Sequence, residues 1–170
     1  TNLQSILDGC AAGIVPAHVA VVVSNRPGVL ALDRAKAAGV PVVTVNYKDY
    51  GKWPESKSRY ETDLVQALRE HGVELVVCAG YDRLAGETLM QAFPGRIINV
   101  HPALLPSFPG LHAQSDALAY GVKVSGATVF FVDPTTDGGP VIIQEAVPVA
   151  EDDTEETLSQ RILEAEHRIL

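Results

Sequence analysis

The chain has 170 residues, of which 46% are hydrophobic and 20% charged. This composition supports one compact domain with a hydrophobic core and excludes a disordered chain or a coiled coil. The formal net charge of -8 argues against nucleic acid as the main partner, because phosphate backbones bind basic surfaces. It still allows a phosphorylated small molecule, which a few backbone N–H groups can hold.

Short β-rich runs alternate with helical stretches, which predicts an α/β, Rossmann-like domain with a mostly parallel twisted sheet and helices on both faces. In chain order, helices are expected at 2–12, 29–38, 59–71, 115–120 and 154–170, and strands at 18–23, 41–45, 75–79, 97–101, 127–132 and 141–149. The segment 102–110 contains three prolines, which exclude a helix there. We expect a single domain over 1–170 that lacks its first strand and its C-terminal end. The sequence opens at the beginning of a helix, where an α/β domain would normally have a strand before it, and it stops inside a helical pattern.

The cysteines and the hydropathy pattern indicate where the protein works. Cys10 and Cys78 lie far apart and predict no disulfide framework. Cys78 lies in the apolar run 75–79 and is expected to be buried. No apolar stretch approaches membrane-spanning length, and the first residues do not resemble a signal peptide. A cytoplasmic protein that does not bind a membrane is the expectation.

Asn99 and His101 are the first candidates for chemistry. They are two residues apart on one expected strand, so their side chains point to the same face. They also lie at its C-terminal end, where α/β sheets bind ligands. An amide can donate to a developing oxyanion, and an imidazole can donate or move a proton. The alternative is an ordinary polar strand end, with the histidine bonded to neighbouring backbone.

Asp137 is the second candidate, in the stretch Asp137-Gly138-Gly139-Pro140. Asp-Gly pairs commonly form turns between strands. The functional alternative is a carboxylate beside His101 that stabilises the cationic imidazole. Thr1 and Asn2 allow two interpretations in the same way: a plain helix N-cap, or the end of a phosphate-binding loop.

Other patterns exclude whole classes of site. The five histidines are scattered and no cysteines are paired, so no metal is expected. The Gly-x-Ser-x-Gly motif of serine hydrolases and the phosphate loop of ATPases are both absent from the sequence. Glu166 lies on a helix with Glu164 and Arg168, and that pattern is typical of a solvated face.

The run 98–110, Ile-Asn-Val-His-Pro-Ala-Leu-Leu-Pro-Ser-Phe-Pro-Gly, resembles the active-site stretch of the folate-dependent formyltransferases. In that superfamily an Asn, a His two residues later and a distant Asp form the catalytic set. Here Asp137 stands at the expected third position, within the matching stretch 137–144. Within the superfamily, 1–4, 79–84, Arg161 and Glu166-His167 resemble the glycinamide ribonucleotide branch.

The resemblance implies formyl transfer from 10-formyltetrahydrofolate, the co-substrate, to the amine of glycinamide ribonucleotide. It implies catalytic roles for Asn99, His101 and Asp137. The implied folate contacts are Lys57, Asp82, Arg83, Leu84, Ala85, Asn99, Asp133, Pro134, Thr135, Thr136 and Asp137. The implied ribonucleotide contacts are Thr1, Asn2, Leu163, Glu164, Ala165 and Glu166. Asp82, Ala85 and Phe130 depart from the residues usual in this branch and concern details of the folate pocket.

Two other functions share parts of this pattern. The same catalytic set occurs in formyltetrahydrofolate hydrolases and in the catalytic domain of methionyl-tRNA formyltransferases, although the charge of -8 disfavours tRNA. A binding module with the same fold is the third possibility, and the presence of all three catalytic residues argues against it. The expected partners are small molecules, with the protein a monomer or homodimer.

Overall fold

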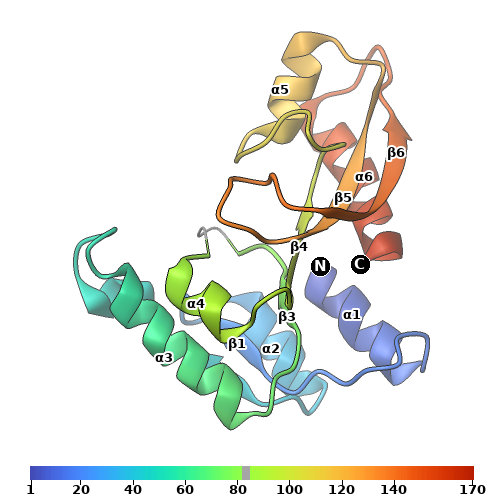
Figure 1. Cartoon of the computed structure of the whole chain (residues 1–170). Coiled ribbons are helices and arrows are strands. Elements are labelled where there is room, and N and C mark those ends of the chain that lie inside the picture. Colours follow the sequence, from blue (N-terminus) through green and yellow to red (C-terminus); the bar gives the residue numbers. More distant parts are fainter. Residues whose placement is uncertain (82–84) are drawn as a thin grey trace. The chain divides into compact units, whose positions relative to one another are not determined.

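The structure is a computed structural model that describes residues 1–81 and 85–170. Its helices and strands form two compact units. The first comprises Thr1, 3–76 and 85–94, and the second comprises Asn2, the described residues of 77–84, and 95–170. Each unit packs its own helices against its own strands (Figure 1).

The first unit contains a short parallel sheet and most of the helices. Strands β1 (Val22–Ser24) and β2 (Val42–Thr44) pair in parallel, with Val23 opposite Val43. The helices are α1 (Asn2–Ala11), α2 (Leu30–Ala37), the 3-10 helix η1 (Tyr47–Tyr50), α3 (Lys57–Glu70) and α4 (Glu87–Ala92). Helix α4 is not predicted by the local sequence pattern, and it lies beside α3 (Figure 1).

Helix α3 organises the core of the first unit. Its apolar residues recur at helical spacing, and among them Tyr60, Leu64 and Leu68 are buried. The rings of Tyr50 and Trp53 stack edge-on against Tyr60, with ring centroids 5.6 and 6.0 Å apart. This aromatic group fixes the chain just before the helix.

The second unit contains a four-stranded sheet in the order β3-β4-β5-β6. The strands are β3 (Val76–Cys78), β4 (Ile97–His101), β5 (Val124–Phe131) and β6 (Val141–Pro148), with helices α5 (Ala113–Tyr120) and α6 (Glu155–Ile169). β4 pairs with β5, and β5 with β6, in antiparallel fashion. The α/β class is confirmed, and an antiparallel edge of this kind is common in mixed sheets. A short loop joins β5 to β6, and a connection of that length makes an antiparallel pair.

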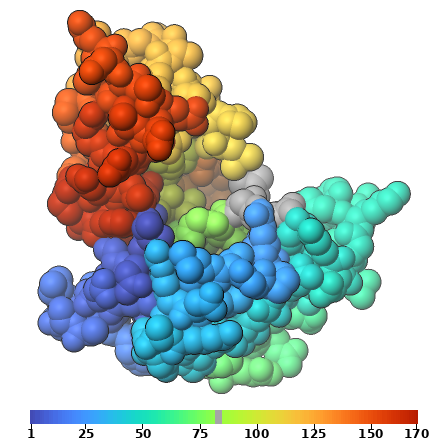
Figure 2. Space-filling model, turned by 180° about the vertical axis from the view of Figure 1, so that it is seen from behind, coloured from blue at the N-terminus to red at the C-terminus, as the bar shows by residue number. Residues whose placement is uncertain are grey.

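The core of the second unit lies between the sheet and α6. Its buried cluster consists of Ala127, Val147, Leu158, Ile162 and Ala165. From behind, α6 (red) and the region of β6 (orange) form one continuous surface (Figure 2). Cys78 is buried, as its apolar surroundings predict, and burial raises the pKa of its thiol to about 11.

Within the described residues, no helix combines the length and the hydropathy that a bilayer crossing requires.

Candidate active site

His101 and Asp137 meet in the second unit. His101 is the last residue of β4, and its side chain is 5% exposed. Its Nδ1 lies 3.5 Å from Oδ2 of Asp137. Its Nε2 lies 2.8 Å from the carbonyl oxygen of Phe108, and since a carbonyl can only accept, Nε2 donates. Both ring nitrogens therefore face acceptor oxygens.

Asp137 is held by its own loop and by the loop after β4. Its Oδ2 accepts a hydrogen bond of 2.8 Å from the N–H of Gly110. Its φ of +51° lies in the left-handed region, which an aspartate tolerates better than most residues. A Cβ at Gly139 would collide with the carbonyl oxygen of Phe131, so the turn requires glycine there. The Asp-Gly-Gly stretch therefore forms a tight turn that also positions the Asp137 carboxylate beside His101.

Asn99 lies on β4, two residues before His101, opposite Phe130 of β5. The alternation of a strand places Asn99 and His101 on the same face of the sheet. Asn99 is half-buried, so its amide keeps some access to solvent. The structure therefore combines two types of hydrogen-bond donor on one strand end, with a carboxylate behind one of them.

Thr128 and Gln144 are two further residues of the candidate site that the sequence pattern did not predict. Thr128 is fully buried opposite His101 on β5. Its hydroxyl donates to the carbonyl of Ala103 at 2.7 Å and accepts from the N–H of Leu105 at 3.0 Å. Gln144 Nε2 donates to Thr128 Oγ1 and to the carbonyl of Leu105, both at 2.9 Å. This network fixes the proline-containing segment that follows His101. The sequence contains one indication of this network, because Gln144 is the last residue of the stretch 137–144 that resembles the formyltransferases.

The expected folate segment between β5 and β6 forms a compact turn. The carboxylate of Asp133 accepts from the backbone N–H of Thr135 at 2.8 Å and from its hydroxyl. A Cβ at Gly138 would collide with the same hydroxyl. The segment thus bonds to itself through Asp133 and Thr135, with Pro134 between these two residues and Thr136 directly after them.

Two of the residues expected to bind the ribonucleotide, 164 positions apart in sequence, are joined by a hydrogen bond. Asn2, which groups with the second unit, donates from Nδ2 to Oε2 of Glu166 at 2.8 Å. Glu166 is only 7% exposed, so the expected solvated helix face is wrong at this position. Oδ1 of Asn2 is buried without a hydrogen-bond partner in the described part of the chain. Of the neighbours of Glu166, Leu163 is half-buried, Glu164 is exposed and Ala165 belongs to the core.

The other residues expected to contact folate either belong to the first unit or are not among the residues that the structure describes. Lys57 begins α3, and its Nζ lies 5.9 Å from the centroid of the Trp53 ring. Ala85 is half-buried just before α4. Asp82, Arg83 and Leu84 lie outside the described residues.

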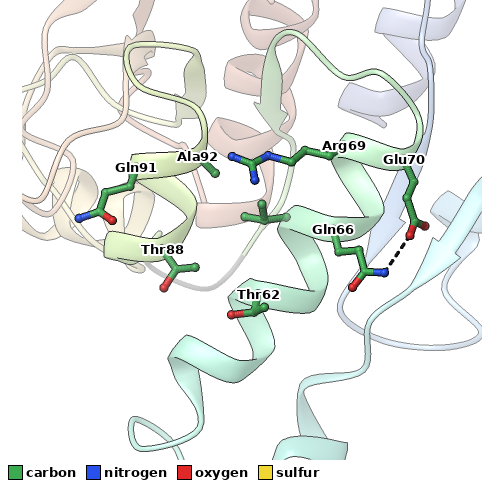
Figure 3. Close-up of a pocket in the computed structure, with 8 residues that line it drawn as sticks. Thr62, Gln66, Arg69, Glu70, Thr88, Gln91 and Ala92 are labelled. Carbon is green, nitrogen blue, oxygen red and sulfur yellow. Dashed lines mark hydrogen bonds between the residues drawn. The ribbon is translucent and has the colours of Figure 1, made fainter.

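A shallow hollow in the first unit contains none of the expected site residues. Its lining comes from α3 and α4, where Arg69 of α3 extends toward α4 and Gln66 hydrogen-bonds Glu70 (Figure 3). Among the residues that the structure describes, no group of three or more potential metal ligands occurs.

A family model described as formyl transferase matches residues 1–170. The chain belongs to the formyl transferase family. This formyl transferase is 45% identical to the phosphoribosylglycinamide formyltransferase of Bacillus subtilis, over 89% of the chain and 76% of that relative. It is 43% identical to the trifunctional purine biosynthetic protein adenosine-3 of Drosophila melanogaster, of whose length it spans 12%. The solved structure of glycinamide ribonucleotide transformylase 1 from Symbiobacterium toebii is 49% identical, with a TM-score of 0.94 over 99% of this chain and 77% of that one.

Proposed function

We propose that this formyl transferase moves the formyl group of 10-formyltetrahydrofolate to the amine of glycinamide ribonucleotide, as a step of purine synthesis. The observation that carries the proposal is the position of His101 between the Asp137 carboxylate and the carbonyl of Phe108, an acceptor that a substrate oxygen can replace. Asn99 lies on the same face of the strand. The names of relatives with 43–49% identity support this choice of substrates. We place the enzyme in the cytoplasm, as a monomer or homodimer.

The proposed chemistry is an acyl transfer through a tetrahedral intermediate. The amine nitrogen attacks the formyl carbon, and the carbonyl oxygen becomes an oxyanion. Asn99 Nδ2 and Nε2 of a protonated His101 donate to that oxygen, and Nε2 exchanges the carbonyl of Phe108 for it. Collapse of the intermediate breaks the bond from the formyl carbon to the folate nitrogen. Asp137 keeps the imidazole cationic and relays the proton lost by the amine toward the departing nitrogen.

The two substrates are assigned to separate groups of residues. Folate is proposed to contact Lys57, 82–85, Asn99 and 133–137, largely through backbone groups. The ribonucleotide is proposed to contact Thr1, Asn2 and 163–166. The hydrogen bond between Asn2 and the buried Glu166 supports the second assignment, because the buried Oδ1 of Asn2 remains available to a donor on a ligand.

The test is formation of deformylated folate, followed by absorbance, with and without glycinamide ribonucleotide. Turnover that requires the ribonucleotide is the expected result. In the same assay, Asn99→Ala is expected to lower kcat by about 10²–10³, the usual cost of one oxyanion donor. Turnover without the ribonucleotide would indicate a formyltetrahydrofolate hydrolase instead. Folate binding without any turnover would indicate a binding module.

A further inference from the structure

Glu61 is a buried carboxylate outside the catalytic set. It lies in the middle of α3 and is 1% exposed. Its Oε1 accepts a hydrogen bond from the N–H of Gly86 at 2.5 Å, and Oε2 lies 3.4 Å from the N–H of Leu89. A buried carboxylate is costly unless such donors compensate it. Glu61 is therefore held in place by its bonds to the first turn of α4.

Glu61 takes the place of a cap that α4 lacks. The N-cap residue of α4 is Gly86, which has no side chain to accept from the first N–H groups of the helix, and these have no partner within it. The carboxylate from α3 accepts from two of these groups, and its negative charge suits the positive end of the helix dipole. The start of α4 thus depends on a residue 25 positions earlier.

Gly86 is required by close approach and not by its backbone angles. Its φ of -102° is open to any residue. A Cβ there would come within 2.5 Å of Oε2 of Glu61 and also of Cε of Lys57. The carboxylate of Glu61, the stem of Lys57 and the backbone of Gly86 therefore meet at one point. Lys57 and Glu61 are four residues apart on α3, so they share one helix face.

The meeting point of Glu61, Lys57 and Gly86 connects two residues of the first unit that are proposed to contact folate. These are Lys57 itself and Ala85, which directly precedes Gly86. We propose that Glu61 is a positioning residue for folate binding, which fixes the backbone after Ala85 against the side chain of Lys57. The inference rests on the proposed function, since it assumes that these two residues face the folate. Glu61 itself is not proposed to touch the substrate.

The test compares Glu61→Ala, Glu61→Gln and Gly86→Ala in the whole chain. The measured quantities are KM for each substrate, kcat, the Kd of tetrahydrofolate by calorimetry, and the unfolding temperature. Loss of the charged acceptor in Glu61→Ala is expected to raise the KM and Kd for folate roughly tenfold to a hundredfold. KM for the ribonucleotide and kcat at saturating folate are expected to stay within about twofold of wild type.

Two further variants separate positioning from general stability. Glu61→Gln keeps the shape and one acceptor oxygen, so it is expected to recover part of the folate affinity. Gly86→Ala leaves the carboxylate present but displaces it, so it is expected to weaken folate binding even if Glu61→Ala does not fold. Glu70→Gln is the matched control, because Glu70 is an exposed acid of the same helix.

Unchanged folate affinity in both Glu61→Ala and Gly86→Ala would overturn the inference. An equal rise in KM for both substrates, in parallel with the loss of stability, would overturn it as well. A wild-type chain that binds tetrahydrofolate but transfers no formyl group would overturn the proposed function alone, since the Kd values still test Glu61.

Discussion

His101 has an acceptor oxygen near each ring nitrogen, and the two neighbours differ in what they can contribute. Asp137 faces Nδ1 on one side, while the carbonyl of Phe108 takes the proton on Nε2. In the proposed reaction, a substrate oxygen replaces this carbonyl. Asp137 has no such freedom, because it also holds the N–H of Gly110. In the proposed mechanism, Asp137 therefore has the electrostatic role and His101 the donor role.

Asp137→Asn is expected to lower kcat by about 10²-fold or more, because a neutral amide no longer stabilises the imidazolium. The amide oxygen can still accept from Gly110, so the Kd for tetrahydrofolate is expected to change little. Steady-state kinetics and calorimetry measure the two quantities. Asp116→Asn, at an exposed carboxylate of α5, is the control. A near wild-type kcat at every pH would contradict the role of Asp137.

Thr128→Val is expected to lower both stability and kcat. The change leaves the N–H of Leu105 and the carbonyl of Ala103 buried without the hydroxyl, at a cost of about 1–3 kcal/mol for each group. Denaturant unfolding and kinetics provide the measurements. Ser125→Ala is a matched control on the same strand, since the buried Ser125 hydroxyl has no hydrogen-bond partner among the described residues. Equal losses in the two variants would argue against a role for the Thr128 network.

At the scale of elements, Arg161 in the middle of α6 ties this helix to Asp153, just before it, and to the end of β6. Arg161 donates to both carboxylate oxygens of Asp153, at 2.8 and 2.9 Å, and to the carbonyl of Pro148 at 2.8 Å. These hydrogen bonds hold the pKa of Asp153 well below its ordinary value of 3.8. A lowered folded-state pKa adds stability that is complete above the ordinary value and declines as the pH falls below it.

Arg161→Ala is therefore expected to lower the unfolding temperature at pH 7, with a difference from wild type that shrinks below about pH 4. Thermal unfolding over a pH series measures this. Arg168→Ala is the control, because the pair of Arg168 with Glu145 is more exposed and is screened by solvent and salt. A difference that stays constant down to low pH would show that Arg161 acts through packing alone.

At the scale of the molecule, each unit depends on its own core. Leu158 is completely buried between α6 and the sheet of the second unit. Leu158→Ala is expected to lower the free energy of unfolding by about 2–5 kcal/mol through a cavity in that core. Denaturant unfolding measures the loss. Leu111→Ala, at a side chain that is 81% exposed in the same unit, is expected to change stability by less than about 0.5 kcal/mol.

The sequence by itself determined the α/β class, the long helices and the resemblance to the formyl transferase family, which the comparisons confirm. Its stretches 98–110 and 137–144 also singled out Asn99, His101 and Asp137 as the proposed catalytic set. Apolar periodicity and a specific local stretch were sufficient for these, since both are properties of neighbouring residues. The same holds for Cys78, whose apolar neighbours predict its burial.

The tertiary structure alone decided which distant residues meet. Helix α4 has no cap of its own and begins on the carboxylate of Glu61, so no local signal could predict it. The burial of Glu166 against Asn2 likewise overrides a charge pattern that is typical of a solvated face. Thr128 became a site residue only through its partners on the loop after His101. Hydrogen bonds between residues far apart in sequence are fixed by packing, and the local pattern of a chain does not contain them.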